Sequence, residues 1–128
     1  MEIGDTAVVA IAARQRWNDT HVTLEKDAQY ALSATGEWID WKTRCGPAGY
    51  PSPNFLLRLS ERARRAPSEP WFALIGALDH DRSTQFTIGT SCGYQPTRTA
   101  ELTCFANDLS LAYCNNKGEV TLTIHRIA

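Results

Sequence analysis

The sequence predicts an all-β domain, a two-sheet β-sandwich of about eight short strands with one inserted helix near residues 55–66. Three observations predict this fold. Apolar and polar residues alternate over short segments, turn-forming residues separate these segments, and only one segment shows helical spacing. The length of 128 residues suits a single domain that spans residues 1–128.

Strand patterns and short polar connections alternate through the first third of the chain. The pair Asn18-Asp19 is typical of a turn, and Gly36 is expected to end a strand because glycine weakens strand interiors. Strands are therefore predicted at Thr6–Ala13, His21–Leu24, Ala28–Thr35 and Glu37–Trp41.

A loop and the predicted helix occupy the middle of the chain. The stretch "KTRCGPAGYPSPN" is rich in Gly and Pro and indicates a loop. From Phe55 to Ala66 the apolar residues recur at helical spacing, arginines fall opposite them, and Pro67 ends the pattern. We interpret the arginines as a solvated outer helix face.

Strand patterns return after the helix. The continuous apolar run Trp71–Leu78 is typical of a central buried strand. His80 stands between two aspartates, but sequence neighbours point in different directions, so this segment indicates a hairpin tip rather than a metal site. Further strands are predicted at Gln85–Gly89, Glu101–Ala106 and Glu119–Ile127.

Composition and charge exclude several classes of partner. The net charge of −1 argues against nucleic-acid binding, which needs a basic face. No apolar run is long enough for membrane insertion. The acidic residues Glu2 and Asp5 precede the first apolar run, unlike the basic start of a signal peptide, so we expect a cytoplasmic protein or one released without a signal peptide.

The cysteines and the catalytic motifs give no sign of an enzyme. Two disulfides in three possible connectivities, or none, are compatible with the four cysteines, and a cytosolic setting favours free buried thiols. There is no CxxC pair, no G-x-S-x-G elbow, no H-E-x-x-H and no glycine-rich phosphate loop. The cysteines are Cys45, Cys92, Cys104 and Cys114.

Oxygen-bearing side chains crowd the connection before the last strand, at Asn107, Asp108, Asn115 and Asn116. Calcium binds six to eight such oxygens and tolerates irregular geometry. One carboxylate and two amides would make a site of low charge, with modest affinity unless a second acid or a ligand completes it. The spacing is not that of an EF-hand, and Asn-Asn-Lys-Gly alone is also compatible with an ordinary turn.

The stretch "NDLSLAYCNNKGEVTLTI" resembles the C-terminal calcium loop and last strand of the PA-I type galactophilic bacterial lectins. "ATGEWIDW" is similar to that family's segment ahead of the calcium, and "CGPAGY" to its Gly-Pro turn. "FALIGAL" followed by "QFTIG" resembles its central strands. The resemblance runs thinly over most of the chain and implies a jelly-roll, galactose-binding-domain-like sandwich.

The resemblance also implies a site. One Ca²⁺ ion would be bound by the side chains of Asp108, Asn115 and Asn116, together with the backbone carbonyls of Trp41 and Ala112. Asp108, Leu109 and Asn115 would contact sugar hydroxyls that the calcium also binds. The expected partner is a carbohydrate of the galactoside type, bound without catalysis.

The loop after the Gly-Pro turn departs from the family, because the His and Gln that grip the sugar there are missing. In this chain Tyr50 is the candidate to stack on a sugar face and Asn54 the candidate to hydrogen-bond it. Because single sites bind monosaccharides weakly, we expect avidity from a homo-oligomer or from fusion to another module. The alternative is a metal-free structural or protein-interaction domain of the same fold.

Overall fold

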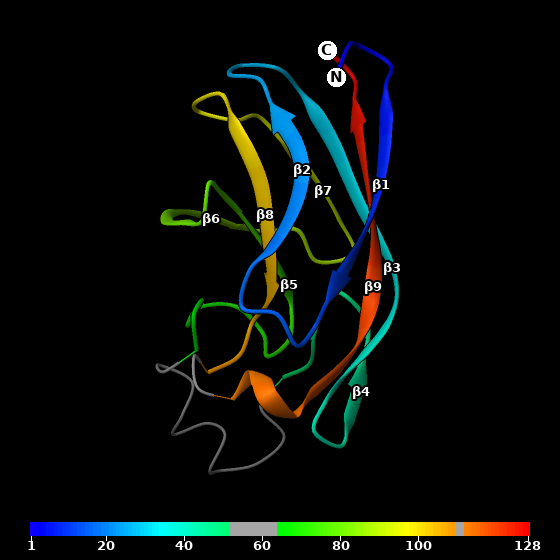
Figure 1. Ribbon diagram of the computed structural model, residues 1–128, viewed down its shortest axis with the longest axis vertical. Coiled ribbons are helices and arrows are strands. Elements are labelled where there is room, and N and C mark those ends of the chain that lie inside the picture. The colour runs from blue at the N-terminus through cyan, green and yellow to red at the C-terminus, as the bar shows by residue number, and fades with distance from the viewer. Residues whose placement is uncertain (52–63, 110–111) are drawn as a thin grey trace.

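The computed structural model describes residues 1–51, 64–109 and 112–128 and contains nine strands in these ranges. They form two antiparallel sheets that face each other (Figure 1). The five-stranded sheet has the order β1-β9-β3-β4, with β7 also paired to β3, and the four-stranded sheet has the order β2-β8-β5-β6. The predicted β-sandwich is confirmed.

Most strands lie where the sequence predicted them, but the strand Thr43–Cys45 lies in a segment predicted as a loop, and the strand Ser91–Tyr94 lies where no strand was predicted. The five-stranded sheet comprises β1 (Thr6–Ala12), β3 (Tyr30–Asp40), β4 (Thr43–Cys45), β7 (Ser91–Tyr94) and β9 (Asn116–Arg126). The four-stranded sheet comprises β2 (Asn18–Leu24), β5 (Leu74–Leu78), β6 (Asp81–Thr87) and β8 (Ala100–Ala106). A short 3₁₀ turn, η2 (Tyr113–Asn115), precedes β9.

The core lies between the sheets and is built from the predicted alternation. Tyr30, Leu32 and Ala34 of β3 are buried while their neighbours are exposed. All residues of β5 are buried, as its continuous apolar sequence predicts. Trp38 and Phe72 are among the largest side chains of this core, while Phe105 belongs to a second, smaller cluster with Ile75 and Tyr113.

Asn18 and Gly36, which were predicted to separate strands, both lie inside strands. Asn18 belongs to β2, where its buried side chain bonds the backbone N–H and C=O of Ala12, so it holds the β1–β2 connection from within the strand. Gly36 has φ of +104° but stays paired with Val120, and β3 continues to Asp40. The predicted separate strands on either side of Gly36 are therefore one strand.

The end of the predicted helix is also corrected. Residues 52–63 lie outside the described part, but residues 64–66 are not helical. Arg64 forms an isolated bridge with Leu109, and the Arg65 N–H donates to the Asp108 carbonyl at 3.1 Å. Both arginines are buried, which contradicts the expected solvated face for this end of the segment.

One glycine fixes how the loop after β4 meets the sandwich. Gly49 has φ of +75°, and a Cβ there would lie 2.2 Å from the Trp71 carbonyl oxygen. This close approach allows the N–H of Tyr50 to donate to the same carbonyl at 2.8 Å. The Gly-Pro turn thereby places Tyr50 beside the end of β3.

The two termini lie together at one end of the sandwich, and η2 lies at the other end (Figure 1). No helix in the described ranges is long and apolar enough to cross a membrane. All four cysteines are free, as expected, but Cys114 is exposed and Cys92 only half-buried.

Candidate functional site

The candidate site begins where β3 ends and β9 begins. The antiparallel pairing places Asp40 opposite Asn116, and the Trp41 N–H donates to the Asn115 carbonyl at 3.3 Å. Trp41 follows the last residue of β3, with φ of +54° and 66% of its surface exposed. Strand pairing therefore brings the Trp41 backbone beside Asn115 and Asn116, as the resemblance implied.

Asp108 reaches this place from the other sheet, two residues after β8, and it is buried. Its Oδ1 accepts a hydrogen bond of 2.7 Å from the Leu109 N–H. Its Oδ2 is buried and has no hydrogen-bond partner among the described residues. A buried carboxylate oxygen without a partner is costly, because it has lost water and gained nothing in exchange.

The side chain of Asn116 likewise has one hydrogen-bonded atom and one unpaired oxygen. Its Nδ2 donates to the Ala13 carbonyl at 3.0 Å, which fixes the amide plane, while its Oδ1 is buried and finds no hydrogen-bond partner in the part of the chain that the structure describes. Two of the three predicted side-chain ligands thus each hold one unpaired buried oxygen.

Asp40 is a second carboxylate that the sequence analysis missed. Burial raises the pKa of Asp108 to about 6, and the negative charge of Asp40 adds to this; the Leu109 N–H and the Asn116 amide act in the opposite direction. Burial also raises the pKa of Asp40, while the hydrogen bond from Tyr50 lowers it. The sequence signal that could have identified Asp40 was its position immediately before Trp41. Strand pairing with β9 places it at the site.

Neither Asp40 nor Asp108 has a cationic partner among the described residues. Over the described ranges, no Lys, Arg or His side chain forms an ion pair with Asp40 or Asp108. The hydroxyl of Tyr50 donates to Asp40 Oδ2 at 2.5 Å, and this bond and burial both raise the pKa of Tyr50, burial more strongly. The site therefore concentrates negative charge in a poorly solvated place, which a cation would stabilise.

The other predicted residues fall in different positions. Asn115 is exposed at the end of η2, and Ala112 directly precedes this turn. Leu109, predicted to contact the sugar, donates its N–H to Asp108 Oδ1. Asn54 lies outside the described residues.

Two neighbouring residues hold the loop in place. Asn107 is fully buried, and its side chain bonds the backbone N–H and C=O of Ala66, so it fastens the 66–70 segment rather than offering a ligand. Tyr113 of η2 donates its hydroxyl to the Ala106 carbonyl at 2.5 Å. Burial raises the pKa of this phenol to about 12, so it stays protonated and keeps this bond at neutral pH.

The donor set fits calcium better than a transition metal. No group of three His, Cys, Asp or Glu side chains gathers anywhere in the described ranges, so carboxylates alone do not complete a site. The available atoms are carboxylate, amide and carbonyl oxygens, the hard donors that calcium takes. The unpaired Oδ2 of Asp108 and Oδ1 of Asn116 are the atoms that such an ion would satisfy.

Comparison with known proteins places the fold. The structure is similar to a solved structure described as "EclA N-terminal domain; PllA-like lectin", with a TM-score of 0.65 and 20% sequence identity. The alignment covers 93% of this chain and 94% of that chain. No protein-family model and no curated protein matches the sequence.

The similarity extends along nearly the whole of both chains, so the lectin-like fold is confirmed over the domain. The neighbour is described as PllA-like, and the PA-I type family stays a prediction.

Proposed function

We propose that this protein is a non-catalytic lectin that binds a carbohydrate through one calcium ion. The observation that carries the proposal is the pair of unpaired buried oxygens, Asp108 Oδ2 and Asn116 Oδ1, beside a second carboxylate, Asp40. The solved structure with a similar fold is described as a lectin, which supports the same class of function.

The chain supplies the ligands from three segments. Asp108 and Asn116 offer their unpaired oxygens, Asn115 offers an exposed amide at the surface, and Trp41 and Ala112 offer backbone carbonyls. Asp40, held by Tyr50, adds negative charge next to Asp108. Two carboxylates favour a divalent cation over water. The second carboxylate also gives the site more negative charge than the single carboxylate predicted from the sequence alone.

When bound, calcium supplies a positive centre that coordinates sugar hydroxyls. Around it the protein orients the sugar through the carboxylate of Asp108 and the amide of Asn115, which accept and donate hydrogen bonds. The exposed ring of Trp41 offers an apolar surface beside the site for one face of the sugar. Tyr50 is committed to Asp40, so we assign it to holding the site.

A galactose-containing glycan is the first ligand to test, on the strength of the sequence resemblance. The experiment is a glycan array probed with calcium and again with EDTA, using wild-type protein and Asn115→Ala. We expect binding to one group of glycans with calcium, its loss in EDTA, and its loss in Asn115→Ala. Because Asn115 is exposed, we expect this variant to keep the fold.

Equal binding with and without EDTA would contradict the calcium mechanism. Absence of binding to every glycan in calcium would instead favour the metal-free structural or interaction domain.

A further inference from the structure

The strand β1 has one free edge, along which its backbone groups point away from the sheet. Within the described ranges β1 ends the five-stranded sheet and pairs with β9 alone. The N–H of Ala13, directly after β1, donates to the Gly118 carbonyl at 3.0 Å. Because backbone groups alternate between the two sides of a strand, the odd-numbered residues of β1 bond β9. The N–H and C=O groups of Thr6, Val8 and Ala10 therefore point to the free edge.

This edge is open over most of its length. Asn18 bonds the N–H and the C=O of Ala12, the last residue of β1. Towards the start of the strand, no described group bonds the outward backbone groups. Thr6, Val8 and Ala10 are all exposed, Val8 over 65% of its surface. The open part of the edge therefore runs from Thr6 to Ala10.

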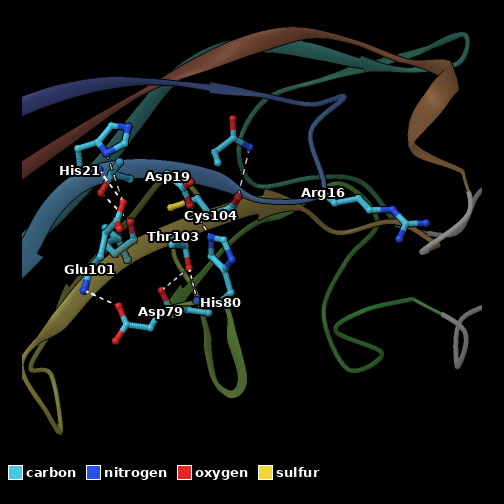
Figure 2. A network of polar contacts seen from close by, with 12 residues as sticks. Arg16, Asp19, His21, Asp79, His80, Glu101, Thr103 and Cys104 are labelled. Atoms are coloured by element: carbon cyan, nitrogen blue, oxygen red, sulfur yellow. Dashed lines mark hydrogen bonds and ion pairs between the residues drawn. The ribbon is translucent and has the colours of Figure 1, made fainter.

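The other edge strands have features that hinder pairing with another chain. β4 and β7 are only three and four residues long. β2 and β6 carry charged residues, and their pairing with β8 and β5 contains register shifts. In β2, Asp19 contacts His80 of the β5–β6 turn, and the His21 N–H donates to Glu101 at 2.9 Å (Figure 2). β1 has seven residues, no charge, no proline and no register shift.

The outward groups of β1 are self-complementary. In an antiparallel pair of two β1 strands centred on Val8, Val8 lies opposite the partner's Val8 and Thr6 opposite the partner's Ala10. Each of these residues directs its N–H and C=O groups at the other strand, so every open backbone group of the edge finds a partner. A pair centred on Thr6 or on Ala10 would leave part of the edge unpaired.

The charges on either side of β1 favour the same arrangement. Glu2 and Asp5 precede the strand, Arg14 follows it, and all three are exposed. None of them forms an ion pair with a described residue. Antiparallel pairing about Val8 places the acidic start of each β1 beside the basic end of the other, so the charges attract at both ends.

We propose that the free edge of β1 binds a second copy of the chain, by antiparallel pairing of β1 with the partner's β1. The pairing joins two five-stranded sheets into one continuous sheet across a two-fold axis at Val8. The two Val8 side chains lie next to each other on the solvent-facing side of this sheet, which removes apolar surface from water.

The dimer also fixes how two candidate sites are presented, a consequence that rests on the proposed function. The end of β1 lies at the candidate site, because the Ala13 carbonyl accepts a hydrogen bond from Asn116 Nδ2 at 3.0 Å. Antiparallel pairing puts this end of one copy beside the start of β1 in the other copy. The two sites therefore lie at opposite ends of the joined sheet, which suits cross-linking of glycans on two separate surfaces.

The test is sedimentation equilibrium in EDTA, so that neither calcium nor a glycan takes part. Wild type is compared with Val8→Lys and Val8→Glu, each alone and as an equimolar mixture. In the dimer the side chain at position 8 meets its own counterpart, so each variant alone sets like charges opposite each other, and the mixture sets opposite charges there. Thr121→Lys is the matched control, because Thr121 is exposed on β9, beside Ala10 but away from the edge.

We expect wild type to dimerise between about 5 and about 500 µM. Dimerisation of each Val8 variant alone should be weaker by at least about tenfold, and the mixture should recover it. Thr121→Lys should dimerise as wild type does, and far-UV circular dichroism checks that every variant is folded. Because no calcium or glycan is present, failure of the lectin function leaves this result unchanged.

Three results would overturn the proposal. One is a wild-type protein that stays monomeric over the whole concentration range. Another is a mixture of the two Val8 variants that dimerises as weakly as each variant alone. The third is equal weakening by Thr121→Lys, which would place the contact on the face of the sheet and not at its edge.

Discussion

Asp108→Asn separates the structural role of this carboxylate from its role at the metal. The substitution keeps the shape of the side chain and removes its charge. In the metal-free protein at pH 7.5 the wild-type carboxylate is buried, ionised and close to Asp40, which is unfavourable. The asparagine also offers an N–H near the unpaired Oδ1 of Asn116. We therefore expect the variant to be more stable than wild type in EDTA.

The magnitude follows from the pKa of Asp108, which is raised from 3.8 to about 6. A proton held more tightly in the folded state stabilises it at low pH, and this contribution is lost as the pH rises from about 4 to about 6. The shift corresponds to about 2 kcal/mol after solvent screening is considered. For a domain of this size that is a rise in Tm of about 5–10 °C in the variant.

Calcium should make the wild-type protein more stable than Asp108→Asn, the reverse of the order in EDTA. At a concentration one hundred times Kd, a ligand stabilises the folded state by about 2.7 kcal/mol, or about 10 °C in Tm. We expect this rise in wild type and none in Asp108→Asn. The assay is thermal unfolding followed by circular dichroism, with Asp27→Asn, an exposed aspartate far along the chain, as the control.

Two results would refute the reasoning about Asp108. One is an Asp108→Asn protein that is less stable than wild type in EDTA at pH 7.5. The other is an equal calcium-induced rise in both proteins. The stability difference in EDTA should also shrink toward zero as the pH falls below the unfolded-state pKa of 3.8, where the carboxyl becomes protonated in both states.

Two further predictions concern pH and backbone geometry. Calcium affinity, measured by calorimetry, should fall about tenfold per pH unit below about 6, because Asp108 must lose its proton to bind the ion; a flat profile between pH 5 and 7 would contradict this. Gly49→Ala should destabilise the protein by about 2–4 kcal/mol in urea unfolding, because its Cβ would lie 2.2 Å from a backbone oxygen at a positive φ. Gly93→Ala, with no atom within 4 Å of the added Cβ, is its control and should change stability by less than about 1 kcal/mol.

The sequence patterns predicted the strands with regular alternation. They did not predict a strand that is recognised mainly by its pairing with a neighbouring strand. β1, β8 and β9 match their predicted ranges closely, because the two-residue period of a strand is local to the segment. No strand was predicted between Gly89 and Glu101, yet Ser91–Tyr94 pairs with β3. A short strand without an alternating pattern can be recognised only from the strand with which it pairs.

The candidate site shows the same division. Asp108, Asn115 and Asn116 were found because they lie close together in one connection. Asp40 was missed because it lies far away in the sequence and reaches the site only through the pairing of β3 with β9. Asn107 was counted with the oxygen donors, but its side chain fastens the 66–70 segment.

The sequence by itself determined the fold class and the oxygen-rich connection, because alternation and side-chain chemistry are local properties. Only the tertiary structure decided which oxygens lie buried without a partner, which second carboxylate faces them, and that Arg65 packs among aromatic rings from three segments. These properties depend on desolvation and on contacts between residues distant in sequence. Both arise only when the two sheets close on each other.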